Sequence, residues 1–178
     1  MYIDYKLEGK YVNLRSVTEE DAEFILDIRN NSRISKYLPP LNVSVAQQRQ
    51  WITKQRADKN SYYFILETPD LKPIGTLSVY DIVDNHGEGG RSCCIGEPFA
   101  AVEANVLLTE FMFNTLKLEY TTIWVYEENK PVIALNQSYG YEWVSTNEDE
   151  NGNKFRVGIL QRERALEKNE IIKKKLRL

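Results

Sequence analysis

The sequence predicts a mixed α/β domain, and three observations support this prediction. The chain has 178 residues, of which 42% are hydrophobic, 11% aromatic and 28% charged, as is typical of one globular domain. Segments with helical spacing of apolar residues alternate with β-rich segments, in the order β-α-α-β-β-β-α-β-α-β-β followed by a tail. At the centre, residues 91–146 alternate strand and helix, which predicts two right-handed crossovers with locally parallel strand pairing.

The N-terminal third is predicted to hold one strand and two helices. Residues 11–15 alternate apolar and polar side chains, which is typical of a short strand. Two capping boxes, Thr18–Asp21 and Ser44–Gln47, predict where the helices begin, because their side chains satisfy the first free backbone N–H groups. Between them, Pro39 and Pro40 break the chain.

The middle of the chain is predicted to form a hairpin and a third strand. Residues 62–67 and 74–82 are rich in β-branched and aromatic side chains, and the turn residues 68–72 separate them. Residues 84–90 are polar and rich in glycine, which predicts a loop. Residues 91–96 are short and apolar, which predicts a strand.

The second half continues the alternation of helices and strands. Residues 103–116 are apolar nearly all round, which is typical of a buried helix. Residues 121–126 are predicted to form a strand, Asn129 to cap the next helix, and Gly140 to end it. The remaining elements are two strands at 141–146 and 155–160 and a charged helix at 162–178. We expect a single domain over residues 1–162 and a charged helical tail over 163–178.

Composition excludes several classes of function. Twenty-six acidic against 23 basic residues give a net charge of −3, so no basic field favours nucleic acid as a partner. No apolar run approaches the ~20 residues of a membrane span, and residues 1–10 do not resemble a signal peptide. Adjacent Cys93 and Cys94 with one histidine form neither a disulfide framework nor a common zinc site. We therefore expect a soluble, cytoplasmic protein without a bound metal.

The order of elements and the residues on it resemble the GCN5-related N-acetyltransferase (GNAT) superfamily. The resemblance covers nearly the whole chain. Its motifs are Glu103-Ala104, Phe113, Leu116, Leu118, residues 123–126, Asn129, Ile133 and Gly140-Tyr141. It implies a mostly antiparallel twisted sheet with a central parallel strand pair, flanked by about four helices. It also implies acetyl-CoA as co-substrate, a small-molecule amine as acceptor, and a homodimer as a possible assembly.

A narrower likeness concerns the acceptor. Residues 28–31 resemble the Arg-Asn signature of nucleotide-sugar N-acetyltransferases of the pseudaminic-acid type, which implies that Arg29 and Asn30 contact the substrate. Asp81, at a strand end, is a further candidate on the substrate side. The bacterial branch with this motif rhythm also acts on small amines and protein N-termini, so a nucleotide-linked amino sugar is the first expectation and a protein N-terminus the second.

The resemblance implies that acetyl-CoA is held around the start of the helix at Glu103. A helix N-terminus favours anions because its N–H groups are unpaired. The family loop has a Gly-x-Gly/Ala pattern, but Phe99 stands at the central glycine here, or Ala100 and Ala101 replace a Gly-Gly pair in a shortened loop. The residues implied for the cofactor are Gly96, Ala100, Ala101, Val102, Glu103 and Asn129, with the backbone N–H of Ile95 polarising the thioester carbonyl.

The catalytic acid and base are less direct to assign. The family tyrosine that protonates the leaving thiolate corresponds to Asn136, which cannot act as an acid. Tyr139, one helical turn further on, is the substitute candidate. For the base that deprotonates the amine, the candidates are Glu88, His86, whose intrinsic pKa suits that role, and Asp81.

These observations predict an N-acetyltransferase in which the amine attacks acetyl-CoA directly, because no cysteine or serine is paired with an activating base. The alternative is an inactive GNAT-fold binding or regulatory module that has lost acetyl-CoA. One feature discriminates between them. The enzyme requires the amides of Ala100, Ala101 and Val102 to converge on an open cavity, whereas the binding module requires Phe99 to fill it.

Overall fold

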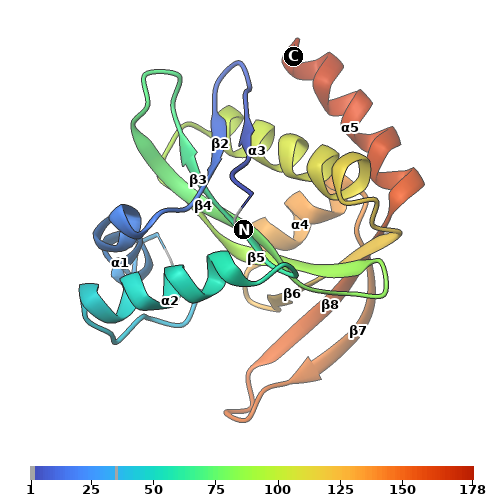
Figure 1. Cartoon of the computed structure of the whole chain (residues 1–178). Helices are drawn as coiled ribbons and strands as arrows, with labels where there is room; N and C mark the ends of the chain where they lie inside the picture. The colour runs from blue at the N-terminus through green and yellow to red at the C-terminus, as the bar shows by residue number, and fades with distance from the viewer. Residues whose placement is uncertain (1–2, 35) are drawn as a thin grey trace.

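The computed structural model describes residues 3–34 and 36–178, and eight strands in them form one sheet in the order β1-β2-β3-β4-β5-β6-β8-β7 (Figure 1). Among these strands, only β5 and β6 pair in parallel. The expected mixed, mostly antiparallel sheet with one central parallel pair is therefore confirmed. No helix in the described residues is long and apolar enough to cross a membrane.

The elements have the following bounds. The strands are β1 Lys6–Leu7, β2 Asn13–Ser16, β3 Tyr62–Glu67, β4 Pro73–Val83, β5 His86–Cys94, β6 Tyr120–Tyr126, β7 Glu142–Glu148 and β8 Lys154–Gln161. The helices are α1 Ala22–Asn30, α2 Val45–Ala57, α3 Pro98–Glu110, α4 Lys130–Tyr139 and α5 Arg162–Leu176. A short 3₁₀ turn, η1 Glu19–Asp21, precedes α1, and a π-helical turn, η2 Phe111–Thr115, extends α3.

Helices and strands with a strong local signal in the sequence lie where they were predicted. The capping box at Ser44 forms, with the Ser44 side chain accepting from the Gln47 N–H, and α2 begins at the next residue. Strand β3 has the predicted bounds. Gly140 ends α4 with a φ of 102°, a left-handed conformation that suits glycine.

The predicted loop at residues 84–90 is wrong, because most of it is the first half of β5. The turn is confined to Asp84 and Asn85, whose φ values of 47° and 63° are those of a tight two-residue hairpin. The glycines in this strand make room for neighbours: a Cβ on Gly90 would lie 2.8 Å from the Tyr80 hydroxyl oxygen. Composition suggested a loop, whereas close packing explains the glycines.

Two further expectations need correction. Helix α3 begins at Pro98, not near Glu103, with Glu97 as its N-cap and proline in the first turn, where its missing N–H is harmless. The second predicted crossover does not place β6 beside β7, because β8 lies between them and is antiparallel to both. The parallel pairing is thus confined to β5 and β6.

Alternate residues of β3 serve two separate cores. Phe64 packs with Phe111 and with residues of α3, α4 and α5, whereas Ile65 packs with residues of α1 and α2. Since neighbouring residues of a strand point to opposite faces, α1 and α2 cover one face and α3, α4 and α5 pack on the other. Residues 163–178 lie against this second layer, where the Asn169 side chain donates to Val106 O at 2.9 Å.

Candidate functional site

The two parallel strands separate soon after they pair. The β5–β6 ladder joins His86–Glu88 to Tyr120–Thr122 and has no further pairs. Opposite this point, the β4–β5 register shifts between Thr76 and Ser78, which marks a β-bulge at Arg91 and Ser92. The strands therefore leave a gap in the middle of the sheet, with backbone groups of β5 and β6 along its edges.

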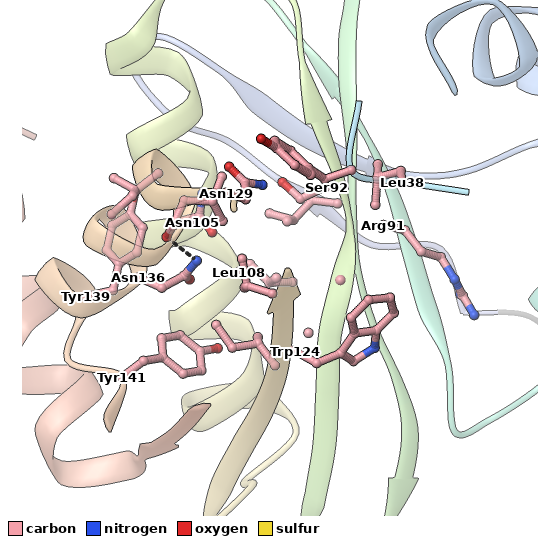
Figure 2. Close-up of a pocket in the computed structure, with 18 of the residues that line it drawn as sticks. Leu38, Arg91, Ser92, Asn105, Leu108, Trp124, Asn129, Asn136, Tyr139 and Tyr141 are labelled. Atoms are coloured by element: carbon pink, nitrogen blue, oxygen red, sulfur yellow. Dashed lines mark hydrogen bonds between the residues drawn. The ribbon is translucent and has the colours of Figure 1, made fainter. Parts of the chain in front are cut away.

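A cavity of about 450 Å³ lies at this gap (Figure 2). Its walls come from five parts of the chain: residues 89–92 of β5, residues 123–126 of β6, the middle of α3, one face of α4, and the segment before α2 that includes Arg33 and Lys36. Three residues singled out from the sequence line it, namely Asn129, Asn136 and Tyr139.

The cavity has two halves, which lie on opposite faces of the sheet. We call them the donor half and the acceptor half. The donor half consists of Asn105, Leu108, Asn129, Asn136 and Tyr139, from α3, α4 and the residue that caps α4. The acceptor half consists of Tyr80, Arg91 and Trp124, on the face covered by α1 and α2. Glu88 lies beside it and does not line the cavity, but it is bonded to Tyr80 and Trp124. The strand register supports the division, because Tyr80 pairs with Glu88 and paired residues share a face.

Tyr139 brings a buried phenol to the donor half. Its hydroxyl lies by the Asn105 side chain but makes no hydrogen bond of normal geometry within the described chain. Burial raises the pKa of Tyr139 above its ordinary value, so the hydroxyl keeps its proton at neutral pH. The neighbouring Asn136 amide donates to Val132 O at 2.9 Å, and the Asn129 side chain makes no cap hydrogen bond.

Glu88 is the acidic group beside the acceptor half. Its Oε1 accepts two hydrogen bonds, a short one from the Tyr80 hydroxyl and one of 2.9 Å from Trp124 Nε1. No described residue donates to Oε2. Burial, followed by the Glu88 carboxylate, raises the pKa of Tyr80. The site therefore holds a carboxylate in a fixed orientation with one oxygen left to accept a proton.

The start of α3 matches neither alternative drawn from the sequence. Phe99 is 42% exposed and lies against Tyr11, with ring centroids 4.7 Å apart, so it does not fill the cavity. The amides of Ala100 and Ala101 both point back to Glu97 O, at 3.0 and 3.3 Å, and neither these residues nor Val102 line the cavity.

Other residues expected at the cofactor have different roles. The Ile95 N–H donates to Ile74 O at 2.8 Å, so it is not available to polarise a carbonyl, and residues 89–92 line the gap instead. The Gly96 N–H lies 3.3 Å from Cys94 Sγ. No local pattern in the sequence marked the bulge at residues 91–92, which depends on pairing with β4.

Glu103 is a structural residue. Its carboxylate is 2% exposed and accepts the backbone N–H groups of Lys10, Tyr11 and Val12, at 2.7, 2.6 and 3.1 Å. Both oxygens are therefore occupied by the N-terminal segment, and the expected contact of Glu103 with acetyl-CoA stays a prediction that its side chain does not serve. Its partners are more than 90 residues away along the chain, so the sequence could not reveal them.

The remaining candidates lie outside the cavity. His86 stacks on Tyr120, with centroids 4.9 Å apart, at the closed end of the ladder. Asp81 is exposed, with a φ of 51°. Arg29 donates to Pro39 O at 2.9 Å, and Asn30 bonds both backbone groups of Leu41. Arg29 and Asn30 thus anchor the chain that follows the cavity-lining segment near Lys36.

Comparisons with known proteins agree with this architecture. A family model described as an acetyltransferase (GNAT) domain matches residues 12–142. Among solved structures, apo FdhC, described as a nucleotide-linked sugar GNAT, has a TM-score of 0.81 and 28% identity, over 95% of this chain and 96% of that chain. Among curated proteins, no sequence matches significantly.

Two more distant structures share the fold. A GCN5-related N-acetyltransferase from Brucella melitensis has a TM-score of 0.80 at 14% identity, over 99% of this chain and 89% of that chain. A spermidine N-acetyltransferase from Vibrio cholerae, in complex with CoA and spermine, has a TM-score of 0.79 at 19% identity, over 89% of this chain and 99% of that chain.

Proposed function

The chain belongs to the GNAT acetyltransferase family, and from this premise we propose that it transfers an acetyl group from acetyl-CoA to the amine of a nucleotide-linked sugar. It is an N-acetyltransferase, and the family uses acetyl-CoA as donor. The observation that carries the choice of acceptor is the charge of the cavity. Among the described residues that line it, Arg33, Lys36 and Arg91 are cationic and none is a carboxylate.

This charge favours an anionic acceptor. A polyamine such as the spermine bound by the Vibrio cholerae enzyme needs acidic partners, whereas the diphosphate of a nucleotide-linked sugar is attracted by cations. The similarity to apo FdhC, a nucleotide-linked sugar GNAT, at 28% identity supports the same choice.

The donor half suits the acyl end of acetyl-CoA. An extended ligand chain in the gap between β5 and β6 can pair with backbone groups that the strands leave free, as an added strand would. The pyrophosphate then lies toward the first turn of α3, where Ala100, Ala101 and Val102 replace the family glycines. The positive end of the helix supplies the attraction, although the loop departs from the glycine pattern.

Transfer is direct in this arrangement. Glu88 Oε2 takes the proton from the attacking amine, the new C–N bond forms, and the C–S bond of the thioester breaks. Backbone N–H groups of residues 90–92, at the bulge, stabilise the tetrahedral oxyanion. Tyr139, which remains protonated because burial raises its pKa, donates a hydrogen bond to the leaving thiolate. The thiolate then takes a proton from water and leaves as the thiol of CoA, while Glu88 returns the proton of the amine to solvent.

The test is a binding measurement followed by an acceptor screen. Calorimetry with acetyl-CoA should show micromolar affinity, about −8 kcal/mol. Nucleotide-linked amino sugars, spermine and a peptide with a free N-terminus are then compared as acceptors at equal concentration. We expect turnover only with the sugars. Preferred acetylation of spermine or the peptide would reject the proposed acceptor, and absence of acetyl-CoA binding would reject the donor site as well.

The start of α3 does not decide between the enzyme and the binding module. Phe99 lies outside the cavity against Tyr11, and Ala100, Ala101 and Val102 do not line it either. The choice of an enzyme is supported by the family match.

A further inference from the structure

Arg91 occupies an unusual backbone position beside the cavity. It lies at the β-bulge of β5 with a φ of 52°, a left-handed conformation that arginine rarely adopts. Its carbonyl accepts the Thr76 hydroxyl at 2.7 Å. Bulges turn side chains away from the regular direction of a strand, and strained residues concentrate at functional sites. The bulge here directs a long cationic side chain toward the acceptor half.

Aromatic rings from three elements surround the guanidinium. Its carbon lies 4.0 Å from the ring centroid of Tyr80, 5.3 Å from that of Trp51 and 5.9 Å from that of Tyr63. Stacking against rings holds a guanidinium by its flat faces and leaves its N–H groups, which lie in the plane, for other partners. The rings therefore orient Arg91 without neutralising its charge.

The N–H groups of the Arg91 guanidinium do not all have a hydrogen-bond partner. Nη1 is buried without a hydrogen-bond partner among the described residues, and no carboxylate of these residues forms an ion pair with Arg91. Buried polar atoms in proteins are nearly always bonded. The Arg91 residue as a whole is partly exposed, and a ligand anion would both bond the buried Nη1 and neutralise the charge.

We propose that Arg91 binds a phosphate of the acceptor and thereby selects amines that carry a phosphate group. The proposal rests on the proposed function and names the residue that recognises the acceptor. Arg91 and Glu88 are three residues apart on β5, up to about 10 Å along an extended strand. A sugar ring fits between the two side chains, with its amine at Glu88 and its phosphate at Arg91. The planar guanidinium matches two phosphate oxygens at once.

CoA also carries phosphates, but the position of Arg91 favours the acceptor. In Figure 2, the Arg91 side chain points away from Asn105, Asn136 and Tyr139, which form the donor half. Trp51 and Tyr63, which flank the guanidinium, belong to α2 and β3 on the face opposite α3. The phosphate of an acceptor on this face can therefore reach Arg91 while CoA occupies the other.

The experiment compares three variants at this position with the wild type. Arg91→Gln removes the charge, Arg91→Lys keeps it without the planar fork, and Arg91→Gly fits the φ of 52° and so preserves the fold. Arg49→Gln, an exposed change on α2, is the matched control. Circular dichroism verifies folding. Calorimetry measures binding of uridine diphosphate, uridine and acetyl-CoA, and kinetics measure KM and kcat for the best nucleotide-linked amine.

We expect Arg91→Gln and Arg91→Gly to weaken uridine diphosphate binding and raise the acceptor KM about 10- to 100-fold. Arg91→Lys should be intermediate, and kcat, uridine binding and acetyl-CoA affinity should change little. Uridine diphosphate binding that is unchanged in Arg91→Gln overturns the proposal. The proposal is also overturned if the variants bind acetyl-CoA and uridine diphosphate more weakly to the same degree. In that case Arg91 would bind a phosphate of acetyl-CoA and not of the acceptor. If the wild type acetylates only amines without phosphate, the proposed acceptor fails, whereas acetyl-CoA binding still tests the donor site separately.

Discussion

Two glutamates illustrate how hydrogen-bonding capacity separates structural from chemical residues. Glu103 accepts three backbone N–H groups on its two oxygens, whereas Glu88 has both of its bonds on Oε1. Both oxygens of Glu103 are thus engaged in a buried site, whereas Oε2 of Glu88 has no donor among the described residues. Glu88 is also bonded to two residues that line the cavity, so we propose it, and not Glu103, as the general base.

Replacing Glu88 by glutamine tests this assignment. Glu88→Gln preserves size and can still accept from Tyr80 and Trp124 through its carbonyl oxygen, but it cannot take up a proton. We expect kcat to fall about 100- to 10,000-fold, with acetyl-CoA affinity by calorimetry within twofold of the wild type. His86→Gln is the comparison, since His86 stacks on Tyr120 outside the cavity. A larger loss in His86→Gln than in Glu88→Gln would assign the base to His86.

Glu103→Gln is expected to affect stability instead. The new NH₂ group would face backbone N–H donors in a buried site, which leaves donors unpaired and costs about 2–3 kcal/mol of unfolding free energy. Urea denaturation measures the change. Glu110→Gln is the control, because Glu110 is partly exposed and bonds only Lys173, so its loss should be under about 1 kcal/mol. Equal losses in both variants would argue against the N-terminal contact.

Asp21 makes stability depend on pH in the acid range. Burial, the largest influence, raises the pKa of Asp21, but hydrogen bonds from Arg15 and Thr18 outweigh it and hold the pKa below the ordinary value. The folded state then binds fewer protons than the unfolded state. Its stabilisation is complete above the unfolded pKa of about 4 and is lost as the pH falls through the folded pKa. Asp21→Asn should therefore lose less stability than the wild type between about pH 6 and pH 3, measured by thermal melting; parallel losses would be the contrary result.

At the scale of helices and strands, the predictions that depend on neighbouring residues alone were confirmed. The Ser44 capping box, the β-rich run of β3 and Gly140 all acted through neighbouring residues, and their elements formed where predicted. The failures depended on distant partners. Residues 86–90 contain three glycines and become a strand because they fit between β4 and β6.

The residues of the candidate site also divide into those that the sequence indicated and those that depend on distant partners. The resemblance to the GNAT family drew attention to Asn129 and Asn136, Tyr139 lies one helical turn further on, and all three line the cavity. Arg91 and Trp124 were not assigned a catalytic or binding role, because their grouping results from a bulge and from the separation of two strands. Such features arise from sheet register, which no short segment specifies by itself.

In the proposed function, binding of acetyl-CoA depends on the first turn of α3. Ala101→Glu introduces a carboxylate where the proposed function requires the pyrophosphate, so we expect acetyl-CoA affinity to fall at least about 100-fold by calorimetry. Ala101→Gln, which adds similar bulk without charge, should lose less. If both variants bind like the wild type, the pyrophosphate lies elsewhere. If both fail equally, bulk and not charge is responsible.

At the scale of the whole molecule, the proposed function places the two substrates on opposite faces of the sheet. The donor half faces α3 and α4, the acceptor half faces α1 and α2, and the two meet at the gap between β5 and β6. In this arrangement both ligands can be bound together, and we expect the reaction to occur where the strands part. A covalent acetyl-enzyme has no geometric advantage in such a site, because the amine can reach the thioester directly.

The thiols nearest the gap are poor nucleophiles. Burial is the main cause that raises the pKa of both Cys93 and Cys94, which keeps them protonated at neutral pH, and Cys93 Sγ lies 3.3 Å from the Thr76 hydroxyl. We therefore expect intersecting initial-rate lines when acetyl-CoA is varied at several fixed acceptor concentrations, as a ternary complex requires, and not the parallel lines of a ping-pong mechanism.

Mass spectrometry of the enzyme incubated with acetyl-CoA alone should detect no acetylated cysteine. Cys94→Ala removes the less buried thiol and should retain kcat within about threefold, since it deletes no group used in the transfer. Parallel rate lines together with an acetyl adduct on Cys93 or Cys94 would instead establish a covalent route. In that case the amine would meet an enzyme-bound acetyl group, and the two faces of the sheet would be used in succession.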